Sequence, residues 1–184
     1  MTANPILKKV KNFVMLIGVL SLGYIIIYMI ASFFGEREND RIAKIKENEK
    51  TTKCKIIKVG NMKGSYAVAE YHVQNLRFER KASSPSDYTY VGENYEIMYD
   101  SLQPTESKIL FNKPFFYNYQ KTSIATGYIN DVDGYTIKYA FRVSGELYGK
   151  FQAHGLNTAP ILNKASYEVE YLVNNPNISI LKWQ

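Results

Sequence analysis

The feature that most constrains this chain of 184 residues is an uncharged run near its N-terminus. Residues 13–34 read FVMLIGVLSLGYIIIYMIASFF and contain no Asp, Glu, Lys or Arg. Because a helix rises about 1.5 Å per residue, the run covers about 33 Å, enough for a hydrocarbon core of about 30 Å. The sequence therefore predicts a transmembrane helix over residues 13–35, preceded by a basic tail over residues 1–12.

A cleaved signal peptide is the competing interpretation of this run. Signal peptides have an apolar region of about 7–15 residues that ends in a small-x-small cleavage site. Here the uncharged run is longer, and residues 29–34 (MIASFF) are a poor match to such a site. The pattern favours an uncleaved anchor in the cell membrane that crosses it once.

The anchor is followed by a segment rich in both signs of charge. Residues 36–50 read ERENDRIAKIKENEK, with strong helix formers and neither Gly nor Pro. We expect a charged helical stalk over residues 36–52. The Lys and Arg count, three before the anchor and five shortly after it, favours a cytoplasmic C-terminal side, but five acids interleave with those five bases. We expect the region after the anchor to lie outside the cytoplasm, with the opposite topology as the alternative.

The formal charge of +6 is concentrated beside the anchor. Residues 1–60 hold 11 of the 23 Lys and Arg but 5 of the 17 Asp and Glu, so residues 61–184 are neutral. A nucleic-acid-binding domain carries its basic patch on the folded part of the chain. The distribution therefore argues against nucleic acid and predicts the lipid bilayer as the nearest partner.

An internal repeat organises the rest of the chain. The segment from Tyr95 to Tyr99 and the segment from Tyr167 to Tyr171 both read Tyr-Glu-aliphatic-x-Tyr, and a proline follows each at the same distance, Pro104 and Pro176. Further upstream, an offset of 70 residues aligns Tyr71 with Phe141. This spacing predicts two copies of one small unit, and chance similarity between two strand-rich segments is the alternative.

Each copy has the pattern of half-buried strands. Ile137, Tyr139, Phe141 and Val143 alternate with polar residues, as do Ala67, Ala69, Tyr71 and Val73. Asp133-Gly134 predicts a hairpin, and Pro104 and Pro176 are expected in connections between strands. The predicted fold class is mainly β: two tandem small β-barrel or β-roll units, residues 53–112 and residues 122–184. An aromatic linker over residues 113–121 is expected to pack at their junction.

A Tyr-x-Val-x-Tyr strand followed by an Asn/Pro turn is the feature in which this chain resembles a known family. Tyr95–Tyr99 with Pro104, and Tyr167–Tyr171 with Asn175-Pro176, resemble the C-terminal strands of uncharacterised bacterial membrane-linked proteins with small β domains. The resemblance covers about a third of the chain. It implies a membrane-anchored β module and no known activity.

Residues with chemical potential are few. Of the two histidines, His72 falls on the polar face of its strand and His154 in a loop, with no recognisable nucleophile or acid beside either. Asn130 to Gly134 resembles a calcium loop, but the template then requires oxygen donors at Ile129 and Ala140. Cys54 lies in a β-like stretch and is expected to be a small buried apolar residue. We predict no catalytic residue, no cofactor and no metal site.

The sequence therefore favours a membrane-anchored, non-catalytic interaction module whose partner is a protein or a cell-surface component. Loops that differ between two copies of a scaffold are free to take on separate roles. The loop after residue 152 differs most from its counterpart, so His154, Leu156 and Asn157 are the predicted partner-binding residues. A cytoplasmic, lipid-facing regulator and an enzyme with an unrecognised site are the alternatives.

Overall fold

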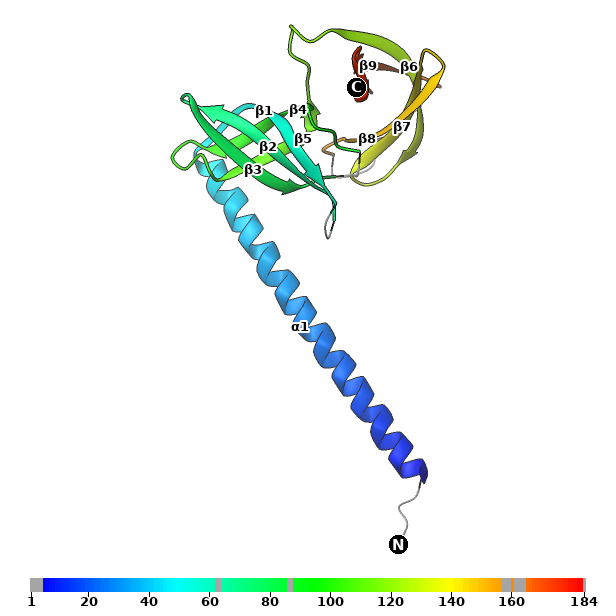
Figure 1. Cartoon of the computed structure of the whole chain (residues 1–184). Coiled ribbons are helices and arrows are strands. Elements are labelled where there is room, and N and C mark those ends of the chain that lie inside the picture. The colour runs from blue at the N-terminus through cyan, green and yellow to red at the C-terminus, as the bar shows by residue number, and fades with distance from the viewer. Residues whose placement is uncertain (1–4, 62–63, 86–87, 157–159, 161–164, 184) are drawn as a thin grey trace. The chain divides into compact units, whose positions relative to one another are not determined.

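The structure, a computed structural model, describes residues 5–61, 64–85, 88–156, 160 and 165–183 (Figure 1). Inside the N-terminal helix, it describes the side chains of residues 15, 17–30, 32 and 39–47. The chain divides into two compact units, Met1–Lys44 and Ile45–Gln184.

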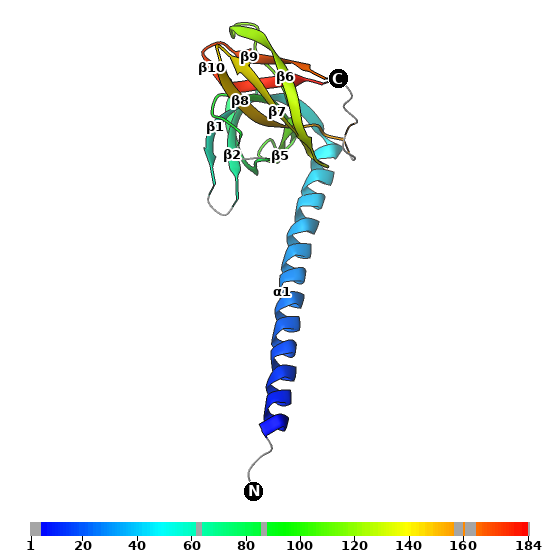
Figure 2. The ribbon, with the colours of Figure 1, turned by 90° about the vertical axis from the view of Figure 1, so that its right-hand side faces the viewer.

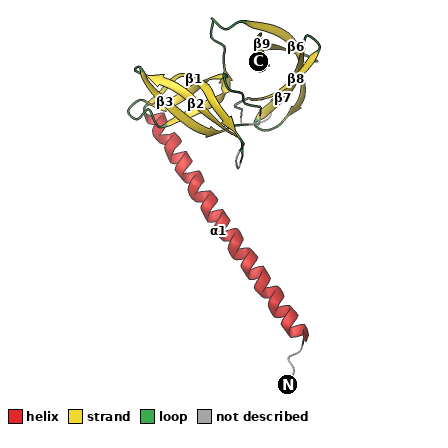
Figure 3. Cartoon of the chain, viewed as in Figure 1, coloured by secondary structure: helices red, strands yellow, loops and turns green. Residues whose placement is uncertain are grey.

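A single helix, α1 (Pro5–Glu47), holds both the expected anchor and most of the expected stalk (Figure 3). Its 43 residues correspond to a length of about 65 Å. Over the described part of the chain, no helix combines the length and the apolar character needed to cross a membrane. The transmembrane helix expected over residues 13–35 is therefore not confirmed.

The helix ends earlier than the predicted stalk. Strand β1 (Glu49–Gly60) begins one residue after Asn48, so residues 50–52, expected to be helical, are in a strand. Lys50, Thr51 and Thr52 pair with β4 across an antiparallel ladder. These ladder bonds and the β-branched threonines outweigh the helical tendency of the preceding lysines. Ile45, at the start of the second unit, is fully buried.

The second unit contains two five-stranded antiparallel sheets with equivalent strand orders. Sheet 1 has the order β3-β2-β1-β4-β5, and sheet 2 has the order β10-β9-β6-β7-β8, which reads the equivalent strands in reverse. The remaining strands are β2 (Tyr66–Val73), β3 (Leu76–Ser83), β4 (Asn94–Asp100), β5 (Ser107–Pro114), β6 (Thr122–Val132), β7 (Thr136–Val143), β8 (Glu146–Ala153), β9 (Tyr167–Leu172) and β10 (Asn175–Lys182).

The two sheets also share their registers. Tyr99 pairs with Ser107 in sheet 1, and Tyr171 pairs with Ser179 in sheet 2, which confirms the offset of 72 for these strands. Phe141 faces Tyr148 as Tyr71 faces Phe78, the predicted offset of 70. The central strands each carry an irregularity at the same place, after Ile56 and after Ile129. The repeat is therefore present in the backbone.

Turn chemistry explains why the equivalent hairpins agree. Gln74 and Asn75 have φ of 51° and 67°, and Ser144 and Gly145 have φ of 52° and 90°. Two consecutive residues with positive φ define a type I′ turn, whose twist matches that of paired strands. The predicted hairpin at Asp133-Gly134 is confirmed between β6 and β7, and the Asp133 carboxylate accepts the Tyr135 and Thr136 N–H groups over 2.7 and 2.6 Å.

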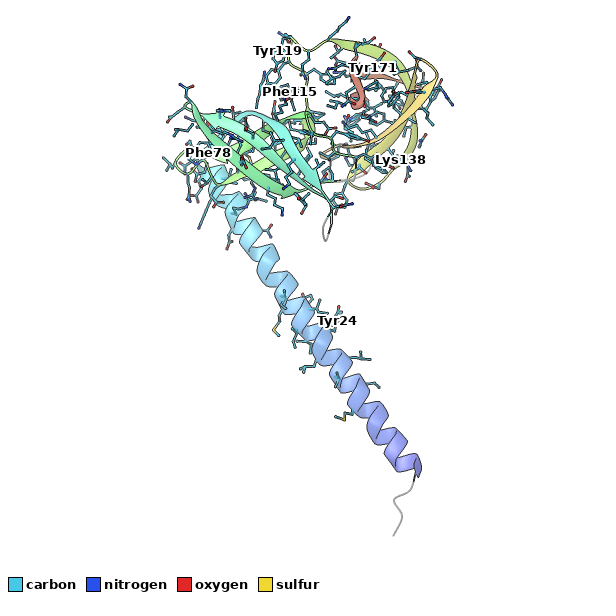
Figure 4. All side chains as sticks on the ribbon, viewed as in Figure 1. Tyr24, Phe78, Phe115, Tyr119, Lys138 and Tyr171 are labelled. Atoms are coloured by element: carbon cyan, nitrogen blue, oxygen red, sulfur yellow. The ribbon has the colours of Figure 1, made fainter. Side chains whose placement is uncertain are left out.

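Each sheet buries the apolar face that alternation predicted. Ala67, Ala69 and Tyr71 lie in the core of sheet 1 together with Cys54, which is buried as expected. Ile137, Tyr139 and Phe141 lie in the core of sheet 2, and Figure 4 shows the labelled Tyr171 directed into the same interior. Tyr171 packs on Phe141 at a centroid distance of 5.7 Å.

Sheet 2 curls until its edge strands meet, and its strands can be followed in Figure 2. Gln152 on β8 donates from Nε2 to the Leu181 carbonyl over 3.2 Å and accepts the Leu181 N–H over 2.8 Å. Lys150, two residues earlier, donates to the Ser179 carbonyl over 2.9 Å. We refer to this contact between the edge strands β8 and β10 as the seam. Along the seam, side chains of β8 hydrogen-bond the backbone of β10 in place of a backbone ladder.

Of the two prolines, Pro104 lies in a connection as expected, between β4 and β5. Pro176 does not, because β10 already begins at Asn175. The β9–β10 register shifts between Asn175 and Ser179, so the ladder is irregular where the proline lacks an N–H.

Candidate functional site

His154, the first of the predicted partner-binding residues, is buried immediately after β8. Its exposed fraction is 4%. Its Nε2 lies 3.1 Å from the Asp133 carbonyl oxygen, and its Nδ1 lies 3.1 Å from the Leu156 backbone nitrogen, which donates to it. A carbonyl accepts and an N–H donates, so the ring is a neutral imidazole protonated on Nε2. Both ring nitrogens are hydrogen-bonded to backbone groups, so this histidine holds the loop in place.

The other two predicted residues have different outcomes. Leu156 has 46% of its surface exposed and faces a hollow against sheet 1. Asn157 lies outside the described residues. The prediction that this loop contacts a partner therefore now depends on Leu156 and on the hollow beside it.

Two open hollows run along β5, where sheet 1 faces the segment after β8 and the end of β10. One has a volume of about 470 Å³ and is lined by residues that include Leu110, Tyr135 and Leu156. The other has a volume of about 340 Å³ and is lined by residues that include Gln152 and Trp183. Asn112 of β5 lines both. We refer to the two together as the β5 groove.

Gly155 allows this loop to approach β5 closely. Its φ is +70°, and a Cβ placed on it would lie 2.2 Å from the Asn112 side-chain nitrogen. Any other residue at this position forces Asn112 or the loop to move. The glycine therefore allows the loop to contact Asn112, which lines both hollows.

The lining of the β5 groove is suited to recognition. It combines apolar side chains with amides and with the lysines Lys108, Lys113 and Lys182. Lys113 pairs with Glu96 over 3.0 Å, and Lys182 pairs with Glu170 over 2.9 Å. Among the described residues, no group of three or more His, Cys, Asp or Glu side chains is arranged to hold a metal ion.

A second cluster of ionisable groups lies where the two sheets meet. The Lys150 Nζ donates to Glu93 Oε1 over 2.6 Å, and the Tyr95 hydroxyl donates to Glu93 Oε2 over 2.6 Å. The Lys150 and Glu93 side chains are 5% and 3% exposed. Burial, and then the charge of Glu93, raise the pKa of Tyr95 well above its ordinary value. Beyond Lys150, Ser179 hydrogen-bonds Tyr139 over 3.0 Å.

This cluster has the composition of a catalytic site but no room for a substrate. The cavity lined by Glu93, Tyr95 and Lys150 holds about 10 Å³, about the limit for one water molecule. Glu93 comes from the connection before β4 and Lys150 from β8, so the ion pair joins sheet 1 to sheet 2. Its observed role is to fasten the two sheets together.

The aromatic linker divides between packing and exposure. Phe116 lines the small cavity beside Glu93 and Lys150, as expected of a residue at the junction. Tyr117 stacks on Tyr119 at 5.2 Å, and Lys53 lies 4.9 Å from the Phe115 ring centroid. Tyr119 has 81% of its surface exposed. Phe115 and Tyr119 are labelled in Figure 4.

Sequence reasoning missed the seam and the ion pair. One signal was available: Tyr148, Lys150 and Gln152 alternate on one side of β8, and the pairing of Tyr148 with Phe141 directs that side inward. A lysine and a glutamine on the inward side of a strand require buried partners. Which partners they find depends on the curl of sheet 2, which a strand pattern does not specify.

Comparison with known protein families, characterised proteins and solved structures gives no significant match. The resemblance of the Tyr-x-Val-x-Tyr strands to uncharacterised membrane-linked proteins stays an expectation. Any functional conclusion therefore rests on the residues of this chain.

Proposed function

We propose that the protein is a membrane-anchored, non-catalytic interaction module that binds an extended segment of a partner protein along the β5 groove. The observation that carries this proposal is the groove itself, which lies between an edge strand of sheet 1 and the segment after β8. Anchor, recognition surface and absence of chemistry each have separate support.

Support for the anchor comes from the sequence and from the surface of α1. The run of residues 13–34 is uncharged, and it extends beyond the side chains that the structure describes. Its described large apolar side chains are exposed around the helix, for example Leu20 at 64% and Tyr24 at 71%. A helix that is apolar on all sides is stable when it is buried in protein or lipid. Insertion into a bilayer removes this surface from water, at about 25 cal/mol per Å².

Support for recognition comes from the position of β5. This strand pairs with β4 on one side and is the last strand of its sheet. An extended peptide can add to such an edge through its main chain, while neighbouring pockets receive alternate side chains. Leu156 and Tyr135, both exposed, provide apolar surface on the opposite wall of the groove.

Support for a non-catalytic role comes from the two sites where chemistry was conceivable. His154 has both ring nitrogens bonded to the backbone. Glu93 and Lys150 are bonded to each other in a cavity too small for a substrate. General acid–base catalysis requires such a group within hydrogen-bond reach of a bound substrate.

Site-specific photocrosslinking in cells tests the groove. A photoreactive amino acid is placed at Tyr135, on the groove wall, or at Tyr119, which is equally exposed (82% and 81%) but outside the residues lining the groove. We expect a discrete crosslinked partner from position 135 and none from position 119. Leu156→Asp should lower that yield at least tenfold, since burial of one leucine contributes about 1.5–3 kcal/mol. Leu102→Asp, at an exposed leucine in the β4–β5 connection, is the matched control. Equal crosslinking from both positions, or insensitivity to Leu156→Asp, refutes the groove.

Topology is tested separately with reporters fused after Gln184. A reporter active only outside the cytoplasm should give signal, because we propose that the β region lies on that side of the membrane. Signal from a cytoplasmic reporter alone favours the lipid-facing regulator instead. Release of the full-length chain from membranes by alkaline washing refutes the anchor.

A further inference from the structure

The outer faces of the two sheets differ where their backbones agree. In sheet 1, Lys55, Glu70 and Glu79 lie side by side across three strands. The equivalent row in sheet 2 is Tyr128, Ala140 and Gly149. A charged row has thus been replaced by one aromatic residue beside two small ones.

The two acids of the sheet 1 row are paired within its own face. Arg77 contacts Glu70 over 2.6 Å and Glu79 over 2.7 Å, which completes the row in that sheet. In sheet 2, the position equivalent to Arg77 is Leu147. Tyr128 is 56% exposed, Leu147 on β8 is 64% exposed, and Ile124, on the same face of β6 as Tyr128 and four residues before it, is 65% exposed. Outward apolar side chains gathered on one sheet face mark an interaction surface.

We refer to Ile124 and Tyr128 on β6 as the apolar strip. The two strands that flank β6 carry outward charges of opposite sign. Strand β9, beside β6, carries Glu168 and Glu170, of which Glu170 is paired with Lys182 of β10, and β7, on the other side of β6, carries Lys138 and Arg142. Glu168 pairs with Thr126. Arg142 follows Phe141, which pairs with Gly127, so Arg142 lies beside the same Thr126. Figure 4 shows Lys138 on the outside of the curled sheet. Glu168, Thr126 and Arg142 thus lie in one row across the three strands.

We propose that a second copy of this chain docks on the outer face of sheet 2 through a two-fold axis parallel to β6. Rotation about such an axis leaves each residue at the same position along the strand direction and places β9 of one copy over β7 of the other. It therefore brings Glu168 of each copy opposite Arg142 of the other and sets Tyr128 against its own equivalent. A two-fold axis perpendicular to the strands opposes acids to acids. The charge pattern thus selects one isologous arrangement.

The proposal does not depend on the β5 groove, because none of these residues lines it. The corresponding face of sheet 1 does not offer a second docking surface of this kind, since it carries charges in place of the apolar residues and its two acids are paired with Arg77. The expected assembly is therefore a closed dimer.

Charge reversal on the full-length chain in detergent micelles tests the dimer, with mass measured by sedimentation. Arg142→Glu and Glu168→Arg should each weaken self-association at least tenfold, because each variant opposes like charges twice. An equimolar mixture of the two variants should recover the dimer, because each chain then meets its complement. His72→Glu changes the position of sheet 1 equivalent to Arg142 and should leave the dimer unchanged. Recovery in the mixture excludes misfolding as the cause of the loss.

A disulfide readout gives the axis. In a Cys54→Ala background, Tyr128→Cys should form a covalent dimer under mild oxidation, because the axis sets residue 128 against itself. Tyr119→Cys, more exposed, should remain largely monomeric. A wild-type chain that is monomeric at every concentration overturns the proposal. So does a dimer that is insensitive to charge reversal, as association through α1 would be, or equal crosslinking at both positions.

Discussion

Sheet 1 and sheet 2 share strand order, register, central irregularity and type I′ turns, yet they differ in their core residues and in their outer faces. In the core, Cys54 faces Tyr71, whereas the equivalent Gly127 faces Phe141. A Cβ at Gly127 would lie 2.3 Å from a methyl group of Val169. On the outside, a bonded row of charges stands where sheet 2 has an apolar strip. The comparison teaches that inward alternation and turn geometry hold the backbone, while outward positions are free to diverge.

The largest expected effect concerns the ion pair between the sheets. Lys150→Met leaves Glu93 buried without a cation and should lower the free energy of unfolding by about 3–5 kcal/mol. The double variant Glu93→Leu with Lys150→Met should recover most of this loss. Denaturant unfolding of the full-length chain, followed by the fluorescence of its single tryptophan, Trp183, measures both. Lys113→Met, at an exposed ion pair, should cost less than about 1 kcal/mol. Equal losses for the two lysines contradict the role of Lys150.

The next effect concerns the thiol of Cys54, whose equivalent in sheet 2 is Gly127. Burial raises the pKa of Cys54 from 9.0 to about 12. Between pH 9 and 12, the unfolded chain releases this proton and the folded chain keeps it. The contribution to stability is therefore complete below pH 9 and declines as pH rises through that window.

Thiol modification measures this difference at constant pH. At pH 8 the folded chain should react about a thousandfold more slowly than the denatured chain, as expected from its smaller thiolate fraction. Cys54→Ala, the control, should not react. A folded chain that reacts at the rate of the denatured one contradicts the burial of Cys54.

The seam of sheet 2 is expected to have a smaller effect. Gln152→Ala leaves the Leu181 N–H and carbonyl without their observed partners and should cost about 1–3 kcal/mol. Gln152→Glu should destabilise the chain at least as much as alanine, because it buries a carboxylate without a cation and sets one of its oxygens against the Leu181 carbonyl. Urea unfolding gives the order, and Gln103→Ala, at an exposed position, is the control. An alanine variant as stable as wild type shows that the seam closes without Gln152.

The turns should give the smallest effect. Changing Gln74 and Asn75 to Asn-Gly should stabilise the chain by about 0.5–1 kcal/mol, because this pair adopts positive φ more readily. Gly145→Ala in the equivalent turn should destabilise it by about 1 kcal/mol. Thermal unfolding of both variants checks the signs. A destabilising Asn-Gly pair contradicts the type I′ geometry in sheet 1.

The parts of the fold that alternation determines were predictable from the sequence. The inward faces of β2 and β7, the hairpin at Asp133 and the offset that aligns Tyr95 with Tyr167 follow from period-two patterns and turn residues. The start of β1 was not, because Lys50 to Thr52 become a strand only by pairing with β4. The prediction that Pro176 lies outside a strand was wrong. Strand β10 accommodates this proline through an irregularity in its register with β9, which the sequence of one strand does not reveal.

The candidate site was predictable only in part. The predicted contact of Leu156 with a partner stays a prediction, although this residue is exposed and lines a hollow. The burial of His154 was not predicted, because it depends on backbone groups of Asp133 and Leu156. The groove needs β5 and the segment after β8 to meet, and they belong to different sheets. Such a meeting is set by the contact between the sheets, including Glu93 and Lys150, which local sequence patterns do not encode.

The seam of sheet 2 has a consequence for the solubility of the chain. Exposed strand edges present unpaired N–H and C=O groups on which another chain can add, the first step of aggregation. In sheet 2, Gln152 occupies both backbone groups of Leu181, and Lys150 occupies the carbonyl of Ser179. Two side chains thus protect the edge of β10 without committing β8 to a continuous ladder. Loss of Gln152 should therefore show itself as precipitation on storage before it shows itself as loss of fold.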